Sequence, residues 1–407
     1  MIADLRINGP RLWQAIMKMA EIDALPEGGC GRLALSQGDK QARDLFKSWC
    51  EEAGCSVSFD ALGNMFARRE GVNNDRLPVA IGSHLDTQPH GGKFDGVYGV
   101  LAGLEVVRTL NDNAVQTDAP LEIVNWTNEE GARFAPAMLC SGVYAGLFDL
   151  DFAHSRKDDD GVRFDSALRD IGYEGKEACG AHPLGVFLEA HIEQGPILDS
   201  AGEPIGVVTG GQGQRWYNIT IVGRDAHSGS TPMASRSDAL VAAAMLVLEV
   251  QHIAKSTDNA AVATVGALTV LPNSRNTIPG LVSFTVDMRH QDDNLLSVMD
   301  QRLRQACEDI DDAKIDLEMI WHNPPVIFDK QAISAIRGAT RELGYAHREM
   351  VSGAGHDACQ IARKVPTAMV FVPCKDGLSH NQAESAKPSD LEAGCNVLLH
   401  AALRLSN

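Results

Sequence analysis

Residues 82–96, GSHLDTQPHGGKFDG, hold two histidines and two aspartates in a glycine-rich stretch between a predicted strand and a predicted helix. Imidazole and carboxylate groups are ligands that proteins offer to transition-metal ions. His84 ends the strand, and the glycines allow the loop to return Asp95 toward it. Asp86 follows His84 by two residues, so on a strand it points the same way and can accept the second N–H of a metal-bound imidazole. The stretch is a candidate for half of a metal site, and a plain polar loop is the alternative.

Polar side chains also follow three other apolar runs. They lie in NWTNEEGARF, EAHIEQG and DGLSHNQAE, which supply Glu129 and Glu130, His191, and His380 respectively. Of two adjacent carboxylates, one can bind a metal while its neighbour serves as general base. The mixture of imidazole and carboxylate suits Zn, Mn, Ni or Co rather than Mg alone. The whole set fits two ions that share one bridging carboxylate.

The first half of the chain predicts strands that alternate with helices. The spacing of apolar residues predicts helices over 8–23 and 39–54 and an antiparallel hairpin over 56–71. Strands in LPVAIGSHLD, PLEIVNWTNEEGARF and LGVFLEAHIEQG each lead into a polar turn, which is the α/β pattern. Because ligands bind at the carboxyl ends of the strands in such sheets, we expect the candidate ligands to meet there.

The pattern changes near residue 214. Alternating strands and two helices, in the order βαββαβ, predict a smaller domain with half-exposed strands. Pro324 and Pro325 mark its end, and an α/β pattern returns with a strand in TAMVFVP and a closing helix from Pro388. We therefore expect a discontinuous catalytic domain, residues 1–212 and 326–407, with residues 213–325 inserted into it.

The composition narrows the class of partner. A chain of 407 residues is expected to form two domains. Its formal net charge of −18 argues against nucleic acid and anionic membranes, which bind clustered Lys and Arg. No run reaches the ~18 consecutive apolar residues of a membrane span, and the N-terminus lacks the pattern of a secretory signal. Nine cysteines without a C-x-x-C pair indicate reduced thiols in a cytoplasmic protein.

Eight motifs along the chain resemble the metal-dependent amidohydrolases of the hydantoinase/carbamoylase type, within the clan of aminoacylase-like dimetal peptidases. They are, in order, GSHLDTQPHGGKFDG, NEEGARF, EAHIEQG, GRDAHSGSTPMASRSDA, NSRNTIPG, VDMRH, GAGHDA and LSHNQAE. The resemblance covers nearly the whole chain, and HIEQG with GRDAHSGSTPMASRSDA separates this family from the ordinary peptidases of the clan. It implies an α/β catalytic domain of the dimetal-peptidase type with an inserted ferredoxin-like α+β domain that serves as lid and dimerisation domain.

The resemblance also implies a role for each matching residue. His84, Asp95 and His191 would bind one divalent ion, and Asp95, Glu130 and His380 would bind a second. Glu129 would be the general base. The substrate would be held by Gln194, His227, Asn276 and Arg289. The turn with His356 in GAGHDACQ is a further candidate for lining the substrate pocket, and a simple helix start is the alternative. His227 would also stabilise the oxyanion. In the family, His227 and Asn276 can reach the active site of a partner subunit, so a homodimer is expected.

These roles imply hydrolysis of a small ureido or amide compound that carries a carboxylate. The first expectation is an N-carbamoyl-L-amino acid, with N-carbamoyl-β-alanine as a variant, releasing ammonia, carbon dioxide and the amino acid. The second is allantoate, which would use the same metals and a different pocket. HIEQG and the pair of Asn276 and Arg289 weigh against an aminoacylase or dipeptidase. A non-catalytic binding relative would lack the base or a ligand, whereas Glu129 and the proposed ligands are all present.

Overall fold

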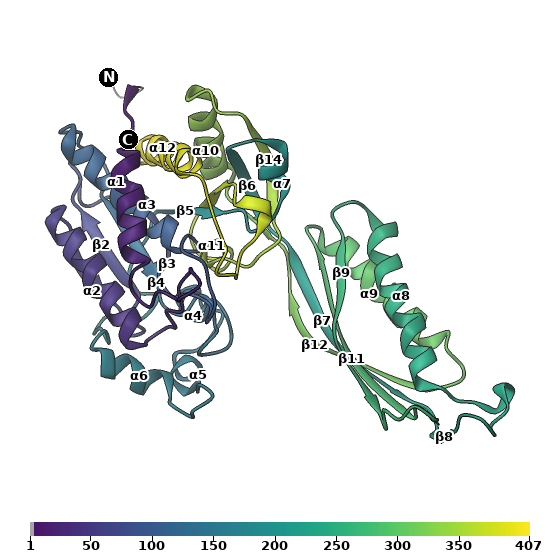
Figure 1. Cartoon of the computed structure of the whole chain (residues 1–407). Helices are drawn as coiled ribbons and strands as arrows, with labels where there is room; N and C mark the ends of the chain where they lie inside the picture. The colour runs from purple at the N-terminus through teal and green to yellow at the C-terminus, as the bar shows by residue number, and fades with distance from the viewer. Residues whose placement is uncertain (1–3) are drawn as a thin grey trace. The chain divides into compact units, whose positions relative to one another are not determined.

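The computed structural model describes residues 4–407. The chain divides into two compact units (Figure 1). Unit 1 comprises Met1–Gly210 and Ile327–Asn407, and unit 2 comprises Gly211–Val326. The second unit is thus inserted into the first, and each is described by itself below.

Unit 1 is built on a nine-stranded sheet in the order β1-β2-β4-β3-β5-β15-β6-β13, with β14 paired to β6. The strands are β1 (Ser56–Phe59), β2 (Met65–Arg69), β3 (Val79–His84), β4 (Leu121–Trp126), β5 (Val186–Ile192), β6 (Ile205–Gly211), β13 (Val326–Ile327), β14 (His347–Ser352) and β15 (Thr367–Val372). The central strands β4, β3, β5 and β15 are parallel neighbours, and β2 and β6 flank them antiparallel. These four strands are buried along their whole length, which explains their largely apolar sequences.

Helices pack against this sheet and against one another. They are α1 (Gly9–Met19), α2 (Gln37–Glu52), α3 (Val97–Asp112), α4 (Leu139–Tyr144), α5 (Leu150–Ser155), α6 (Phe164–Ile171), α7 (Ile197–Ala201), α10 (Lys330–Glu342), α11 (Asp357–Ile361) and α12 (Pro388–Ser406). The long helix α3 packs on β3, β4 and β5, while α12 packs on β5 and β15. α3 begins directly after Gly96, whose φ is 66°. A methyl group at this position would overlap the ring of His84, so the turn requires glycine.

Unit 2 is a four-stranded antiparallel sheet with two helices. Its elements are β7 (Gly213–Val222), β8 (Ala226–His227), α8 (Ala239–Thr257), β9 (Val262–Leu271), β10 (Thr277–Ile278), β11 (Leu281–His290), α9 (Asp293–Glu308) and β12 (Lys314–Asn323). The sheet order is β12-β7-β11-β9, and β8 pairs separately with β10. Alternate residues of β7, such as Tyr217 and Ile219, are buried with α8 and α9, whereas Trp216 and Val222 are exposed. The predicted α/β fold with an inserted βαββαβ domain is confirmed.

One helix in the described part of the chain, α8, is long and apolar enough to cross a membrane by length and composition alone. Its buried side chains, among them Leu246, Val250 and Ile253, belong to the core of unit 2. That packing is typical of an amphipathic helix lying on a sheet.

Candidate metal centre

Four parallel strands bring the candidate ligands to one edge of unit 1. His84 ends β3 and His191 lies near the end of β5. Glu129 and Glu130 follow β4 after a short turn, and His380 follows β15 in the loop before α12. Because β4, β3, β5 and β15 are parallel neighbours, their carboxyl ends meet at the same edge of the sheet.

The first group of ligands consists of His84, Asp95 and His191, whose ligand atoms all lie within 4.8 Å of one another. Nε2 of His191 lies 3.1 Å from Asp95 Oδ1, and Nε2 of His84 lies 3.7 Å from the same oxygen. The Nδ1 atom of each ring lies 2.9 Å from a backbone oxygen, that of Asp86 for His84 and that of Ile192 for His191. Backbone acceptors at Nδ1 can hold the hydrogen of a neutral ring, in which case the Nε2 atom of each ring would be available to bind an ion.

The second group consists of Asp95, Glu130 and His380. Nε2 of His380 lies 3.4 Å from Asp95 Oδ2 and 3.4 Å from Glu130 Oε2. Gln88 holds the Glu130 carboxylate with its backbone N–H at 3.1 Å and its side-chain amide at 2.7 Å. The side chain of His380 is 52% exposed, so this group opens toward solvent. Asp95 belongs to both groups, with Oδ1 facing the first and Oδ2 facing the second.

The electrostatics of the two groups fit divalent cations. Burial opposes ionisation of Asp95, but hydrogen bonds to His191 and His380 and the charge of His191 outweigh it and hold its pKa well below the usual range. Burial, reinforced by Asp95 and Asp86, raises the pKa of Glu130 well above its usual value. Buried carboxylates this close repel one another unless a cation compensates them. Three imidazoles and two carboxylates, arranged in two groups that share Asp95, are a donor set suited to two ions of the Zn, Mn, Ni or Co kind.

Glu129 stands beside the first group without being a member of either. Its Oε2 lies 3.5 Å from His84 Nε2, and the side chain is buried. Burial raises the pKa of Glu129 well above its usual value, and the charges of Asp357 and Glu130 add to the effect. A buried carboxylate with a raised pKa takes up a proton more readily than an exposed one, which is a property that a general base needs.

The structure gives Asp86 a different task from the expected one. The expectation was that its carboxylate accepts the second N–H of His84, but that carboxylate lies 3.9 Å from Nδ1 and the backbone oxygen of Asp86 is nearer. The carboxylate instead accepts the backbone N–H groups of Glu129 and Glu130, each at 3.2 Å. Asp86 therefore fixes the turn that presents the two glutamates. Side-chain direction alone suggested the wrong acceptor because a backbone oxygen competes for the same nitrogen.

Gln194 also lies within the centre rather than at its rim. Its Nε2 donates to Asp95 Oδ2 at 2.8 Å and to Ser379 Oγ at 3.1 Å. Two residues that the sequence did not single out complete this network. Ser379 Oγ lies 3.1 Å from Asp95 Oδ2, and Glu384 Oε2 lies 3.0 Å from Ser379 Oγ. The position of Glu384, four residues after His380 in LSHNQAE, is the only signal that could have pointed to it.

His356 lies behind the first group. It is 2% exposed, its ring centroid is 4.5 Å from that of His191, and its Nε2 lies 3.0 Å from Ser352 Oγ. Together with His191 and Glu189 it forms a third cluster of potential ligand atoms. Glu189 accepts the hydroxyl of Ser83 at 2.7 Å. His356 thus supports His191, and its contact with substrate stays a prediction.

The remaining predicted site residues lie in unit 2. His227 and Asn276 are neighbours in the β8–β10 ribbon, where His227 pairs with Thr277. Nδ1 of His227 accepts the backbone N–H groups of Gly229 and Ser230 at 3.1 and 3.2 Å, which places the hydrogen of a neutral ring on Nε2. The exposed side chain of His227 can therefore donate a hydrogen bond.

Arg289 lies at the other end of unit 2. On β11 its Nη2 donates to Asp287 Oδ2 at 2.8 Å and its Nε donates to the same carboxylate. The eight residue steps from Leu281 to Arg289 span about 26 Å at ~3.3 Å per residue, and the ribbon is attached at the Leu281 end. Arg289 and the pair of His227 and Asn276 are thus far apart within one chain.

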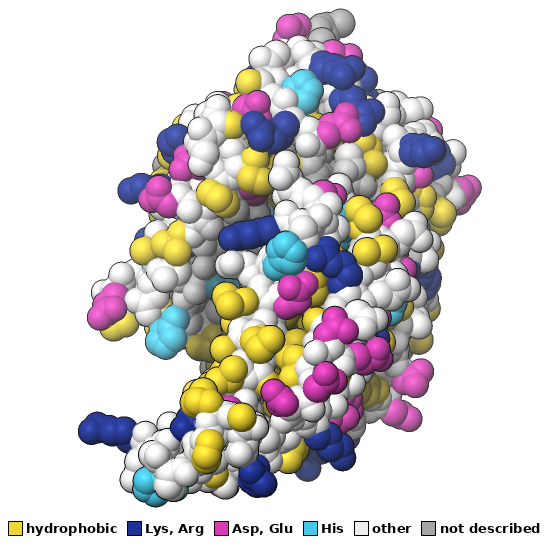
Figure 2. All heavy atoms as spheres, turned by 90° about the vertical axis from the view of Figure 1, so that its right-hand side faces the viewer, with side chains coloured by type: hydrophobic (Ala, Val, Ile, Leu, Met, Phe, Trp, Pro, Cys, Tyr) yellow, Lys and Arg dark blue, Asp and Glu magenta, His cyan; other side chains and the backbone are white. Residues whose placement is uncertain are grey.

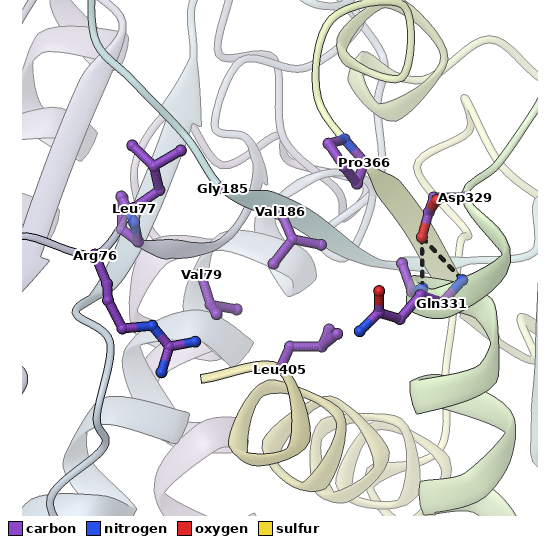
Figure 3. Close-up of a pocket in the computed structure, with 11 residues that line it drawn as sticks. Arg76, Leu77, Val79, Gly185, Val186, Asp329, Gln331, Pro366 and Leu405 are labelled. Atoms are coloured by element: carbon purple, nitrogen blue, oxygen red, sulfur yellow. Dashed lines mark hydrogen bonds between the residues drawn. The ribbon is translucent and has the colours of Figure 1, made fainter. Parts of the chain in front are cut away.

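A pocket of about 410 Å³ lies at the opposite, amino ends of the central strands (Figure 3). Its charged members are engaged in structural contacts. Asp329 accepts the N–H groups of Gln331 and Ala332 at 2.9 Å each and thereby caps α10. Arg76 pairs with Asp118. The charged groups that line this pocket therefore stabilise the fold, and the candidate functional residues of unit 1 lie at the carboxyl ends of the strands.

Comparison with known proteins agrees with this arrangement. The profile of the family described as Peptidase family M20/M25/M40 matches residues 80–404. A solved amidase of the hydantoinase/carbamoylase family from Burkholderia multivorans superposes with a TM-score of 0.96 at 53% identity, covering 99% of this chain and 98% of that one. The chain belongs to peptidase family M20/M25/M40, and its resemblance to the hydantoinase/carbamoylase type is confirmed.

Curated relatives narrow the comparison further. An N-carbamoyl-L-amino-acid amidohydrolase from Rhizobium meliloti is 49% identical over 402 residues, which are 98% of this chain and 96% of the relative. An allantoate amidohydrolase from Bacillus subtilis (strain 168) is 33% identical over 394 residues, 95% of each chain. The chain is therefore similar over its full length to enzymes of both expected kinds, with higher identity to the first.

Proposed function

We propose that this protein is an amidohydrolase that cleaves the ureido C–N bond of N-carbamoyl-L-amino acids. The observation that carries the proposal is the pair of ligand groups that share Asp95, with Glu129 buried beside them. The 49% identical N-carbamoyl-L-amino-acid amidohydrolase supports the choice of substrate.

His84, Asp95 and His191 would hold one divalent ion, and Asp95, Glu130 and His380 the other. Two such ions lower the pKa of a water molecule and polarise a carbonyl group when bound. Glu129 would accept the proton of the attacking water and pass it to the leaving nitrogen. The C–N bond to the terminal amino group breaks, so ammonia leaves, and the resulting carbamate decomposes to carbon dioxide and the amino acid.

Residues of unit 2 would bind the rest of the substrate. Arg289 can hold a carboxylate with two parallel hydrogen bonds, which a lysine cannot. His227, with its hydrogen on Nε2, can donate to the developing oxyanion, and Asn276 beside it offers a further amide. Gln194 would act from unit 1, where it already contacts Asp95.

The distance within unit 2 supports a homodimer. A carbamoyl amino acid is far shorter than the ~26 Å of β11 that lie between Arg289 and Leu281, the end of the strand to which the β8–β10 ribbon is attached. For all these residues to act on one substrate, Arg289 would come from the chain that holds the metals, and His227 and Asn276 from a second copy. The active site would then be complete only in the dimer.

A surface of unit 2 suits this association. Val241, Met245 and Leu248 form an exposed apolar row along α8, each more than half exposed. α8 packs beside β9, which is an edge strand of the sheet. Apolar side chains gather in the lower half of Figure 2 beside a group of acidic ones. An apolar helix next to an open strand edge offers both a hydrophobic contact and backbone hydrogen bonds to a second copy.

Allantoate is the second candidate substrate, supported by the 33% identical allantoate amidohydrolase.

We also propose a cytoplasmic location, which the nine free cysteines support. A non-catalytic relative is disfavoured because Glu129 and both ligand groups are intact.

The test is ammonia release by protein loaded with Mn or Zn. The panel contains several N-carbamoyl-L-amino acids, N-carbamoyl-β-alanine and allantoate, with N-acetyl-amino acids assayed for free amine. Release from a carbamoyl amino acid is expected, and its rank order gives the side-chain preference. Release from allantoate alone would replace the proposed substrate, and inactivity on all ureido compounds would reject the proposal.

A further inference from the structure

Glu384 is a buried carboxylate placed next to the shared ligand Asp95. It lies in the loop before α12 and is 4% exposed. Its Oε1 accepts the backbone N–H of Phe94 at 2.9 Å and that of Asp95 at 3.2 Å. Its Oε2 lies 3.0 Å from Ser379 Oγ. These contacts tie two loops together that are almost three hundred residues apart in the chain.

The loop around Asp95 is shaped to admit this carboxylate. A methyl group on Gly92 would overlap the carboxyl group of Glu384, so the loop can close around it only with glycine at this position. A second carboxylate so close to Asp95 is unfavourable by charge, because like charges repel in a buried site. Stability alone therefore does not account for the arrangement, which points to a geometric role for Glu384.

That role follows from the two oxygens of Asp95. Oδ1 faces His84 and His191, while Oδ2 faces His380 and accepts from Gln194. Sharing between two groups requires the carboxylate plane to keep this direction. Glu384 fixes the backbone of Asp95, and Ser379 contacts both Asp95 Oδ2 and Glu384. The main chain and the side chain of Asp95 are thus both held.

We propose that Glu384 is a positioning residue that locks Asp95 in the orientation needed to serve both ligand groups. The proposal rests on the ligand assignment made under Proposed function. It predicts that loss of Glu384 weakens both groups at once, because Asp95 belongs to each. It also predicts that excess metal restores turnover, because Glu129 and the substrate contacts are untouched.

The experiment compares Glu384→Ala and Glu384→Gln with the wild type in full-length protein. Titration with Mn and with Zn after chelator treatment measures affinity and stoichiometry. Glu384→Ala should bind both ions about tenfold or more weakly, as is usual when a residue that supports a metal ligand is removed. Glu384→Gln should stay close to the wild type, because an amide oxygen can accept both backbone N–H groups while its NH₂ donates to Ser379. Gly92→Ala should cause the same loss of metal affinity, because the added methyl group would displace the carboxyl group of Glu384.

Asp329→Ala is the matched control. Asp329 also accepts two backbone N–H groups, but it caps α10 at the opposite ends of the strands. Unchanged metal affinity in Glu384→Ala, or an equal loss in Asp329→Ala, would overturn the proposal.

Hydrogen exchange on the metal-free proteins separates this inference from the proposed function. Peptides covering residues 92–96 should exchange faster in Glu384→Ala than in the wild type, and should not change in Asp329→Ala. If the wild type binds no metal but residues 92–96 still exchange faster in Glu384→Ala, the positioning of Asp95 by Glu384 is supported and the proposed function is rejected. If the wild type binds two ions but hydrogen exchange of residues 92–96 is the same in Glu384→Ala, the proposed function is supported and the positioning role of Glu384 is rejected.

Discussion

The two units present their candidate functional residues in opposite ways. In unit 1, Asp95 and His191 are buried, come from a loop and a strand end, and are held by contacts to backbone and neighbouring side chains. In unit 2, His227 is exposed on a two-stranded ribbon that is attached at the Leu281 end of β11, whereas Arg289 lies about 26 Å further along that strand. The fold of unit 1 brings its candidate metal ligands together, whereas the fold of unit 2 keeps His227 and Arg289 apart.

The difference matches two kinds of task. Activating water needs groups fixed relative to one another, because misplacement of reacting groups is costly in rate. Binding a carboxylate or an oxyanion can be assembled later, when a domain or a second chain arrives. We infer that unit 1 carries the reaction and unit 2 completes substrate binding. The predictions below alter one side of this division at a time.

The largest effect is expected for Glu129→Gln. Turnover should fall at least ~100-fold, because the amide cannot accept a proton from water. Metal content should stay at the wild-type level, because Glu129 belongs to neither ligand group. Glu130→Gln is the contrast, since it should lose metal from the second group. Parallel measurement of kcat and metal content checks both, and normal turnover by Glu129→Gln would remove it as the base.

Arg289→Ala should have the next largest effect. Losing charged hydrogen bonds to the substrate carboxylate should raise KM about 10- to 100-fold, with a smaller change in kcat. Arg289→Lys should fall between, because lysine keeps the charge but not the paired donors. Steady-state kinetics on an N-carbamoyl-amino acid, with melting temperature as a folding control, makes the measurement. An unchanged KM would show that another residue holds the carboxylate.

The sequence predicts that the candidate metal ligands of unit 1 lie close together, because several of them follow apolar runs, and the structure brings them together. His84, His191 and His380 stand at or after the ends of buried strands, and parallel order brings such ends together. The motif resemblance then separated Glu129 from Glu130. The fold followed from the same patterns, since fully buried strands and half-exposed strands differ in periodicity.

The supporting residues could not be predicted in the same way. Glu384 lies in a loop without periodicity, and its contacts come from a segment almost three hundred residues away. Asp86 was placed by side-chain direction, but the backbone oxygen that took its expected contact leaves no pattern in a sequence. The strands β6, β13 and β14 were also not predicted. Of these, β13 has only two residues and is too short to show a periodic pattern.

A complementation experiment tests whether the two ends of unit 2 act on different active sites. At a substrate concentration near the wild-type KM, His227→Ala and Arg289→Ala chains are each expected to be poorly active, and mixed dimers of the two should regain about half of wild-type activity per dimer. One of the two sites would then have its own Arg289 and an intact His227 from the second copy. Differently tagged chains, co-expressed and purified as the mixed dimer, allow the measurement. Mixed dimers as inactive as the parents would place His227 and Arg289 in the same site.

The smallest effect concerns stability in unit 1 away from the metal centre. His182 stacks on Phe66, and its ring nitrogens lie 2.8 Å from Glu122 and 3.2 Å from Glu177. Burial opposes the charge of His182, but the hydrogen bonds and charges of the two glutamates outweigh it and raise its pKa above the usual 6.5. The charged form is thus favoured in the folded protein.

The sign of the pH dependence follows from that raised pKa. The stabilisation by charge should be complete below pH 6.5 and should be lost as the pH rises through the higher pKa of the folded state. Compared with His182→Gln, the wild type should therefore lose an advantage of up to about 1 kcal/mol over this range. Chemical unfolding of both proteins at several pH values gives the difference in unfolding free energy, in which the contributions of groups common to both cancel.

The stacking on Phe66 contributes at every pH, so only the part of the difference that changes with pH reports the charge of His182. A difference that is constant with pH would show that His182 acts by packing alone, so that the charged bridge to Glu122 has no role in holding unit 1 together. A difference that grows as the pH rises would show that folding disfavours the charged form, which contradicts the raised pKa of His182.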